Sequence, residues 1–238
     1  MSTVVLQALP FGTYMVMVPA LASPENRITS ALVFWTSEEN MQTVVSGRLA
    51  SFRGLDDVAA TSSGRILLSL SASGLMAICA HVSLPLFFTP VPLTLQTFAV
   101  LLTGLVLGPS LACSAMILYL AEGLMGLPVF SPAGPGGAAQ LLGPTGGFLL
   151  AYPFAALIAG FLARAAGRHL SRFGAALTAG SAADIIILVS GGAWLSHFPH
   201  TSLHTAAVMG IAPFLPGETI KIIAAAASFA GLRRFVRS

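Results

Sequence analysis

Residues 146–163 read Gly146-Gly-Phe-Leu-Leu-Ala-Tyr-Pro-Phe-Ala-Ala-Leu-Ile-Ala-Gly-Phe-Leu-Ala163, 18 consecutive positions without a charged side chain. A helix that crosses the hydrocarbon core of a bilayer needs about 20 mostly apolar residues, with a range of roughly 17–25. The nearest charges in the chain are Glu122 on one side and Arg164 directly after the segment. This length and composition predict a transmembrane helix.

The composition of the whole chain agrees with a membrane location. Of 238 residues, 55% are hydrophobic and only 8% are charged, and the mean hydropathy is +0.87. A soluble domain carries about 25% charged residues, so a water-soluble protein is excluded. The length allows one integral membrane domain and little else.

Six apolar segments of this kind follow residue 65. They are 66–84, 93–108, 110–127, 146–163, 174–194 and 216–232. Stretches rich in proline and glycine separate most of them, and such stretches interrupt helices because proline lacks a backbone donor. The sequence therefore predicts an all-α integral membrane protein with six transmembrane helices.

The arginines predict how these helices are oriented. With six spans, the N-terminus, the turn at 108–110, the loop at 164–173 and the C-terminus lie on one side, and every loop arginine lies there. Cytoplasmic loops carry an excess of Lys and Arg. We therefore expect a multi-pass plasma-membrane protein with both termini cytoplasmic. This topology also explains the pI of about 9.3 without a nucleic-acid partner.

Residues 1–65 differ from the rest, because they hold nine of the 19 charges and no segment long enough to cross a bilayer. We expect a weakly structured cytosolic extension over 1–65 and a six-helix substrate-binding domain over 66–238. A second possibility is that translation begins near Met41 and the upstream residues are an artefact of the chosen start site.

Four charges lie within apolar sequence: Glu122, Asp184, Glu218 and Lys221. Glu218 and Lys221 are three residues apart, so a helix places them on one face. Intramembrane charges are costly and usually face a cavity or a partner. The pair could form a ligand site or simply neutralise itself. Lys221 is the only lysine and does not belong to a GxxxxGK[ST] loop, so the chain is not a P-loop ATPase.

Proline- and glycine-rich motifs flank the predicted helices. They are Thr89-Pro-Val-Pro-Leu-Thr-Leu-Gln-Thr97, Gly126-Leu-Pro-Val-Phe130, Pro132-Ala-Gly-Pro-Gly-Gly137, Gly143-Pro-Thr-Gly-Gly147 and Pro213-Phe-Leu-Pro-Gly-Glu-Thr-Ile-Lys221. In this order they resemble the BioY family, the biotin-specific substrate-binding (S) components of energy-coupling-factor (ECF) transporters. The resemblance implies the six-helix S-component fold and capture of biotin without a cofactor. It also implies a transmembrane scaffold subunit and two ATPase subunits as partners.

The resemblance and the polar residues together predict a substrate site. We expect Lys221 to contact an anionic or acceptor group of biotin and Glu218 a donor, and the reverse pairing is the alternative. The family usually has Asp at the position of Glu218. The loop 131–145 is expected to close over the ligand, whose rings would contact Leu127, Val129 and Phe130. Gln96 and Tyr119 could instead bond to neighbouring helices. The predicted substrate-binding residues are Gln96, Tyr119, Phe130, Gly136, Gly137, Gln140, Glu218 and Lys221.

Ser69, Ser73 and Ala77 repeat every four residues on the first predicted helix. Small residues at this spacing permit close helix approach. In the family that the chain resembles, the first helix meets the scaffold subunit, so these residues are a predicted partner interface. Packing within the domain is the alternative.

Two other classes of protein need consideration. A free-standing proton-coupled carrier or channel would use Asp184 and Glu122 as a relay. An intramembrane enzyme would need a nucleophile and base, or a metal site, at membrane depth. The three histidines at 197, 200 and 204 have no acidic or cysteine neighbour to complete a metal site. We therefore expect no enzyme activity, no metal and no cofactor.

Overall fold

A computed structural model describes residues 6–9, 13–16, 34–35, 55–198 and 202–235. The chain divides into two units, Met1–Asp57 and Val58–Ser238. In the first unit, strands β1 (Leu6–Leu9), β2 (Thr13–Val16) and β3 (Phe34–Trp35) form an antiparallel sheet in the order β1-β2-β3. The remainder of the expected extension up to residue 54 lies outside the described residues.

The second unit is mostly helical. An antiparallel hairpin of β4 (Ser83–Leu84) and β5 (Leu93–Thr94) interrupts it. Helix α2 (Leu55–Ala60) includes the last residues of the first unit and the first residues of the second. The other helices are α3 (Ser62–His81), α4 (Gln96–Leu107), α5 (Pro109–Leu124), α6 (Gly137–Leu142), α7 (Gly146–Ala166), α8 (Arg172–Leu195), α9 (Leu203–Gly210) and α10 (Leu215–Phe235).

Each of the six predicted segments corresponds to one apolar helix, namely α3, α4, α5, α7, α8 or α10. Within the described residues, α3, α7, α8 and α10 are long and apolar enough to cross a membrane. Helix α4 has 12 residues and α5 has 16, so they measure about 18 and 24 Å. Both are shorter than the hydrocarbon core of about 30 Å. Over the described residues the protein is thus mostly helical, and four of its helices are long and apolar enough to cross a membrane.

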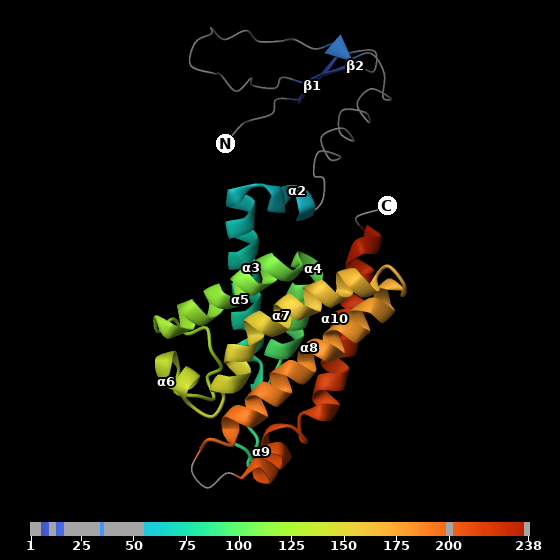
Figure 1. The fold of residues 1–238 in the computed structure, drawn as a ribbon. Helices are drawn as coiled ribbons and strands as arrows, with labels where there is room; N and C mark the ends of the chain where they lie inside the picture. The colour runs from blue at the N-terminus through green and yellow to red at the C-terminus, as the bar shows by residue number, and fades with distance from the viewer. Residues whose placement is uncertain (1–5, 10–12, 17–33, 36–54, 199–201, 236–238) are drawn as a thin grey trace. The chain divides into compact units, whose positions relative to one another are not determined.

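The helices place the connecting segments at two ends of the unit (Figure 1). One end carries the α4–α5 turn, the α7–α8 turn and the end of α10, while α6 and α9 lie at the other. Gly108 has a φ of 80°, and a Cβ there would lie 2.0 Å from Nη2 of Arg164. The α4–α5 turn is therefore in direct contact with the last turn of α7.

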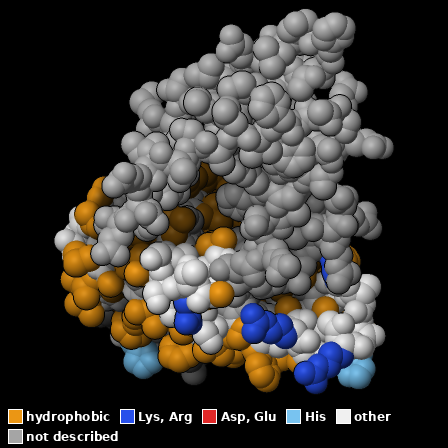
Figure 2. Space-filling model, turned by 90° about the horizontal axis from the view of Figure 1, so that it is seen from above, with side chains coloured by type: hydrophobic (Ala, Val, Ile, Leu, Met, Phe, Trp, Pro, Cys, Tyr) orange, Lys and Arg blue, Asp and Glu red, His pale blue; other side chains and the backbone are white. Residues whose placement is uncertain are grey.

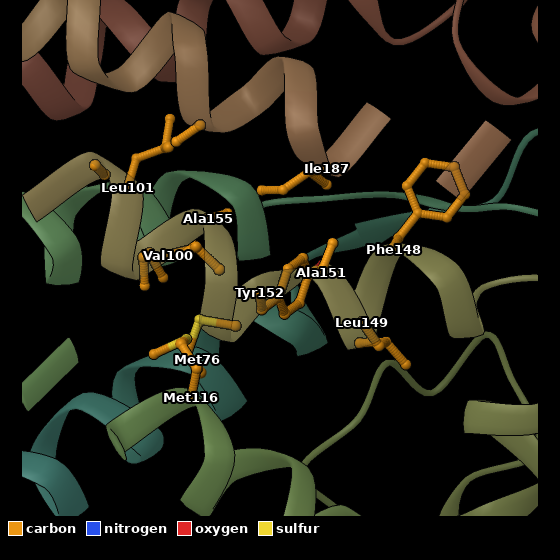
Figure 3. Close-up of a cluster of buried hydrophobic side chains, with 14 of the residues drawn as sticks. Met76, Val100, Leu101, Met116, Phe148, Leu149, Ala151, Tyr152, Ala155 and Ile187 are labelled. Atoms are coloured by element: carbon orange, nitrogen blue, oxygen red, sulfur yellow. The ribbon is translucent and has the colours of Figure 1, made fainter. Parts of the chain in front are cut away.

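The core depends on small residues that let helices approach closely. A Cβ on Gly104 of α4 would lie 2.6 Å from the Ala156 carbonyl oxygen of α7, which is the close approach that small residues permit in membrane helices. Larger side chains fill the space between the other helices. Figure 3 shows this cluster, including Met76 of α3, Met116 of α5 and Tyr152 of α7.

The outward faces of the helices carry exposed apolar side chains. Ile78, Phe154 and Ile220 are each more than 60% exposed, although all are large hydrophobic residues. Figure 2 views the unit from the top of Figure 1 and shows hydrophobic and basic side chains, but no acidic ones, among the visible described residues. Such faces are expected where a bilayer replaces water around the protein.

Candidate functional site

A pocket lies between the hairpin, α4, α7, α8 and α10, near the end of the unit that carries α6 and α9 (Figure 1). Its polar lining includes Gln96, Gln140, Glu218 and Lys221, which are four of the predicted site residues. The other lining residues are Val91, Pro92, Thr94, Thr97, Ser131, Thr145, Phe148, Leu149, Tyr152, Ile187, Leu188 and Phe214.

The start of α10 positions the charged pair. Pro216 lies in the first turn, where its missing N–H would have no helical partner. Glu218 follows in the same turn, where the helix dipole favours a negative charge. Lys221 Nζ donates to Glu218 Oε1 over 2.7 Å, and the two residues are 6% and 4% exposed. The ion pair considered from the sequence is thus present, and it also lines the pocket.

The Glu218 and Lys221 head groups retain capacity for further hydrogen bonds. Thr97 Oγ1 of α4 also donates to Glu218 Oε1, over 3.4 Å, while Glu218 Oε2 is buried without a partner among the described residues. An ammonium has three donors, and the ion pair uses one of them. The pair can therefore offer both a donor and an acceptor to a ligand.

The two glutamine amides reach the pocket from different segments. Gln96 Nε2 donates to Tyr119 Oη over 2.7 Å, and its Oε1 accepts from Thr94 Oγ1. Gln140 is 3% exposed, and its Oε1 accepts from the Gly136 N–H over 3.1 Å. Its Nε2 group has no hydrogen-bond partner in the described part of the chain, so it can donate to a ligand.

Tyr119 and Phe130 lie behind the pocket wall and are not part of its lining. The Tyr119 hydroxyl donates to the Val129 carbonyl over 3.1 Å. The Tyr119 and Phe130 rings meet edge to face, with centroids 5.4 Å apart. The Phe130 ring also occupies the space where Gly123 would carry a Cβ. These residues therefore hold the segment after α5 against that helix.

The expected lid loop contributes to the pocket through Ser131, Gln140 and Thr145. Gly136 and Gly137, with φ of 72° and 58°, shape the entry into α6 and are absent from the lining. The loop is fixed near its end, because Trp194 Nε1 of α8 donates to the Gly143 carbonyl over 2.9 Å.

The apolar wall comes from residues that were not predicted from the sequence. Phe148 of α7 and Phe214 lie 6.3 Å apart between ring centroids, and Ile187 of α8 joins them in the lining. Leu127, Val129 and Phe130, which were expected to contact the ligand rings, are not in it. Tyr152 also lines the pocket. Its hydroxyl is a polar group in the middle of an apolar span, and this feature of the sequence could have identified it as a site residue.

Of the predicted interface residues Ser69, Ser73 and Ala77 on α3, Ser73 packs within the domain. Ser73 is 1% exposed and donates to Glu122 Oε2 of α5. Ser69 and Ala77 are half-buried. The packing alternative therefore accounts for Ser73, whose side chain does not reach the surface.

No set of three His, Cys, Asp or Glu side chains within the described ranges is placed to hold a metal ion. His200 of the histidine-containing segment lies outside those ranges.

Comparisons with known proteins agree with the motifs. The chain is 40% identical over 132 residues to a probable biotin transporter BioY of Pyrococcus horikoshii, covering 56% of this chain and 74% of that protein. It is 37% identical over 154 residues to the biotin transporter BioY of Thermotoga maritima, covering 65% and 86%.

A solved structure is similar as well. The S-component for biotin from an ECF-type ABC transporter matches with a TM-score of 0.66 and 28% identity, over 73% of this chain and 94% of that one. The sequence model of the BioY family matches residues 52–238, which is most of the chain. The chain therefore belongs to the BioY family.

Proposed function

We propose that this protein captures biotin from outside the cell, as the substrate-specific subunit of an ATP-driven ECF transporter. The observation that carries the proposal is the buried Lys221–Glu218 pair, which lines a pocket together with two glutamine amides. The relatives are named biotin transporters and the structural neighbour is the S-component for biotin. This agreement favours a transport subunit over an intramembrane enzyme.

The pocket matches the chemistry of biotin. Biotin has a carboxylate, which suits the Lys221 ammonium, and a ureido ring with two N–H donors, which suits Glu218 Oε2. The Gln140 amide can donate to the ureido oxygen. Phe148 and Phe214 provide an apolar surface for the bicyclic rings. In this proposal the 131–145 segment closes over the bound ligand.

We further propose six membrane crossings with both termini in the cytoplasm. Helix α4 has 12 residues, and the hairpin segment before it continues the crossing next to the pocket. Non-helical backbone at membrane depth is tolerated where it lines a cavity. The contact between Gly108 and Arg164 puts the α4–α5 turn at the end that carries the arginines of the α7–α8 turn. The pocket then opens to the outside.

Energy would come from partner subunits, because the chain has no P-loop. The structural neighbour comes from an ECF-type ABC transporter, which supports a scaffold and ATPase subunits as partners. Because Ser73 is buried, we place the scaffold contact on the neighbouring face of α3. Leu70, Gly74 and Ile78 are exposed there, and a Cβ on Gly74 would contact nothing within 4 Å.

The binding function is tested with protein purified in detergent, without nucleotide or partners. Isothermal titration calorimetry should show tight binding of biotin to the wild type. Lys221→Ala should weaken binding about 10- to 100-fold, because a charged ligand group loses its partner. Ile220→Ala is the matched control, because Ile220 is 69% exposed on the same helix. Unchanged affinity in both Lys221→Ala and Glu218→Ala would refute the site.

The transport function requires a cell-based test. A biotin-requiring strain without its own uptake system should grow on low biotin when it expresses this chain together with scaffold and ATPase subunits. Equal growth without those subunits would instead support the free-standing carrier.

A further inference from the structure

Asp184 is a buried acid that the proposed biotin contacts do not use. It lies in the middle of α8 and is 4% exposed. The charged and titratable groups near it are Glu218 and Lys221 of α10 and Tyr152 of α7. Its neighbours along α8, Ile187 and Leu188, line the pocket. Asp184 therefore lies directly behind the charged end of the proposed site.

The Asp184 carboxyl group is close enough to the Glu218 carboxyl group for the two acids to interact. Each carboxyl group also has one buried oxygen, Asp184 Oδ1 or Glu218 Oε2, that has no hydrogen-bond partner among the described residues. Ionised carboxylates only accept hydrogen bonds. Contact between these two groups therefore requires a proton on one of them.

The charge balance leads to the same conclusion. Two acids share one ammonium in this cluster. If both acids were ionised, one negative charge would be buried without compensation, which is strongly destabilising. A single proton on the Asp184–Glu218 pair makes the cluster neutral, with Lys221 balancing the remaining carboxylate.

We propose that Asp184 is a positioning residue of the biotin site, which holds a proton and donates it in a hydrogen bond to Glu218 Oε2. This inference rests on the proposed function. A carboxylate has about four acceptor sites. Lys221 and Thr97 use those on Oε1, and Asp184 uses one on Oε2. One acceptor site on Oε2 then remains for a ligand N–H.

Loss of this proton changes the site. Two neighbouring carboxylates repel each other, so Glu218 leaves its position and Lys221 is shared between two anions. The ammonium then attracts a third anion, the ligand carboxylate, more weakly. Biotin affinity should therefore fall as the pH is raised from slightly acidic to alkaline.

The test compares Asp184→Asn with Asp184→Ala and the wild type. The Asn side chain has nearly the same shape, and its NH₂ group donates to Glu218 at every pH. By calorimetry at neutral pH, Asp184→Asn should bind biotin within about threefold of wild type, whereas Asp184→Ala should bind about tenfold more weakly or worse. The affinity of Asp184→Asn should stay constant across the pH range in which the wild type loses affinity.

Glu122→Gln is the matched control, because Glu122 is also an acid within an apolar helix but pairs with Ser73. It should keep the wild-type pH profile. The inference is overturned if Asp184→Asn weakens binding as much as Asp184→Ala, or if its pH profile follows that of the wild type.

Thermal unfolding of the ligand-free protein separates this inference from the proposed function. The wild type should lose stability as the pH rises from acidic values until the folded protein releases the proton, because only the folded protein holds the two acids together. Asp184→Asn should not show this loss, and equal pH dependence in both proteins would overturn the inference. If the wild type binds no biotin at any pH, the proposed function fails while the stability comparison still decides the role of the proton.

Discussion

The Tyr119 hydroxyl joins three segments through two hydrogen bonds. It accepts from Gln96 at the start of α4, and it donates to the Val129 carbonyl in the segment after α5. Tyr119 itself is fully buried. The residue therefore holds Gln96 in the orientation in which its other atoms face Thr94 and the pocket.

Tyr119→Phe should reduce the thermal stability of the ligand-free protein. The substitution leaves the Gln96 amide and the Val129 carbonyl without a partner, and each unsatisfied buried group costs about 1–3 kcal/mol. Thermal unfolding in detergent should show a lower midpoint. Ser114→Ala is the control, because it deletes a hydroxyl on the same helix whose bond goes to the exposed Ser110 carbonyl. An equal midpoint in the two variants would contradict the bracing role.

The charged residues of the site were predictable from the sequence, but the aromatic wall was not. Lys221 and Glu218 stand out because charge is rare in apolar helices. Phe148 and Phe214 are ordinary residues for a membrane protein. Nothing in their sequence context distinguishes a side chain that faces the pocket from one that faces lipid. Only the packing of α7 against the segment before α10 brings their rings together.

Helix α3 shows a similar limit for whole elements. The repeat of Ser69, Ser73 and Ala77 identified a face for close packing, yet a repeat does not say which neighbour it faces. In this structure the Ser73 hydroxyl donates a hydrogen bond to Glu122 of α5. The exposed face is one position further along, at Leu70, Gly74 and Ile78.

Gly74→Phe should therefore leave biotin binding intact and reduce uptake. A Cβ atom on Gly74 would have no other atom within 4 Å, so the larger side chain fits the isolated subunit. It would prevent the close approach of a scaffold helix, and co-purification with the scaffold and uptake should both fall about tenfold or more. Gly231→Phe is the matched control, because its surroundings on α10 are equally open. Normal assembly of Gly74→Phe would place the partner contact elsewhere.

Long apolar helices were predicted with small boundary errors, whereas short elements were missed. Helix α7 begins at residue 146 as expected. Helices α6 and α9 lie in segments that were expected to be connectors. The strands β4 and β5 take the last two residues of the predicted span 66–84 and the first two of the predicted span 93–108. Helix α6 has six residues, which is less than two turns, so no periodic pattern can develop. Its position depends on contacts such as that between Gln140 and Gly136.

The arrangement of the helices gives the second unit two chemically different ends. The last turn of α7 carries Arg164 and the α7–α8 turn carries Arg168. Figure 2 shows basic side chains on that end without visible acidic ones. The opposite end carries the loop of Ser131 and Gln140, whose residues from 131 to 145 are uncharged. Because positive charge is retained in the cytoplasm, this asymmetry supports the proposal that the pocket opens to the outside.

Single-cysteine labelling in intact cells tests that orientation. In a background in which Cys79 and Cys113 are replaced by Ala, Ala133→Cys should react with a membrane-impermeant maleimide, because Ala133 is exposed in the loop beside the pocket. His169→Cys, exposed in the α7–α8 turn, should react only after the membrane is permeabilised. Neither substitution removes an arginine, so the charge asymmetry stays the same. Labelling of His169→Cys in intact cells would reverse the proposed topology, and the pocket would then face the cytoplasm, where capture of external biotin is impossible.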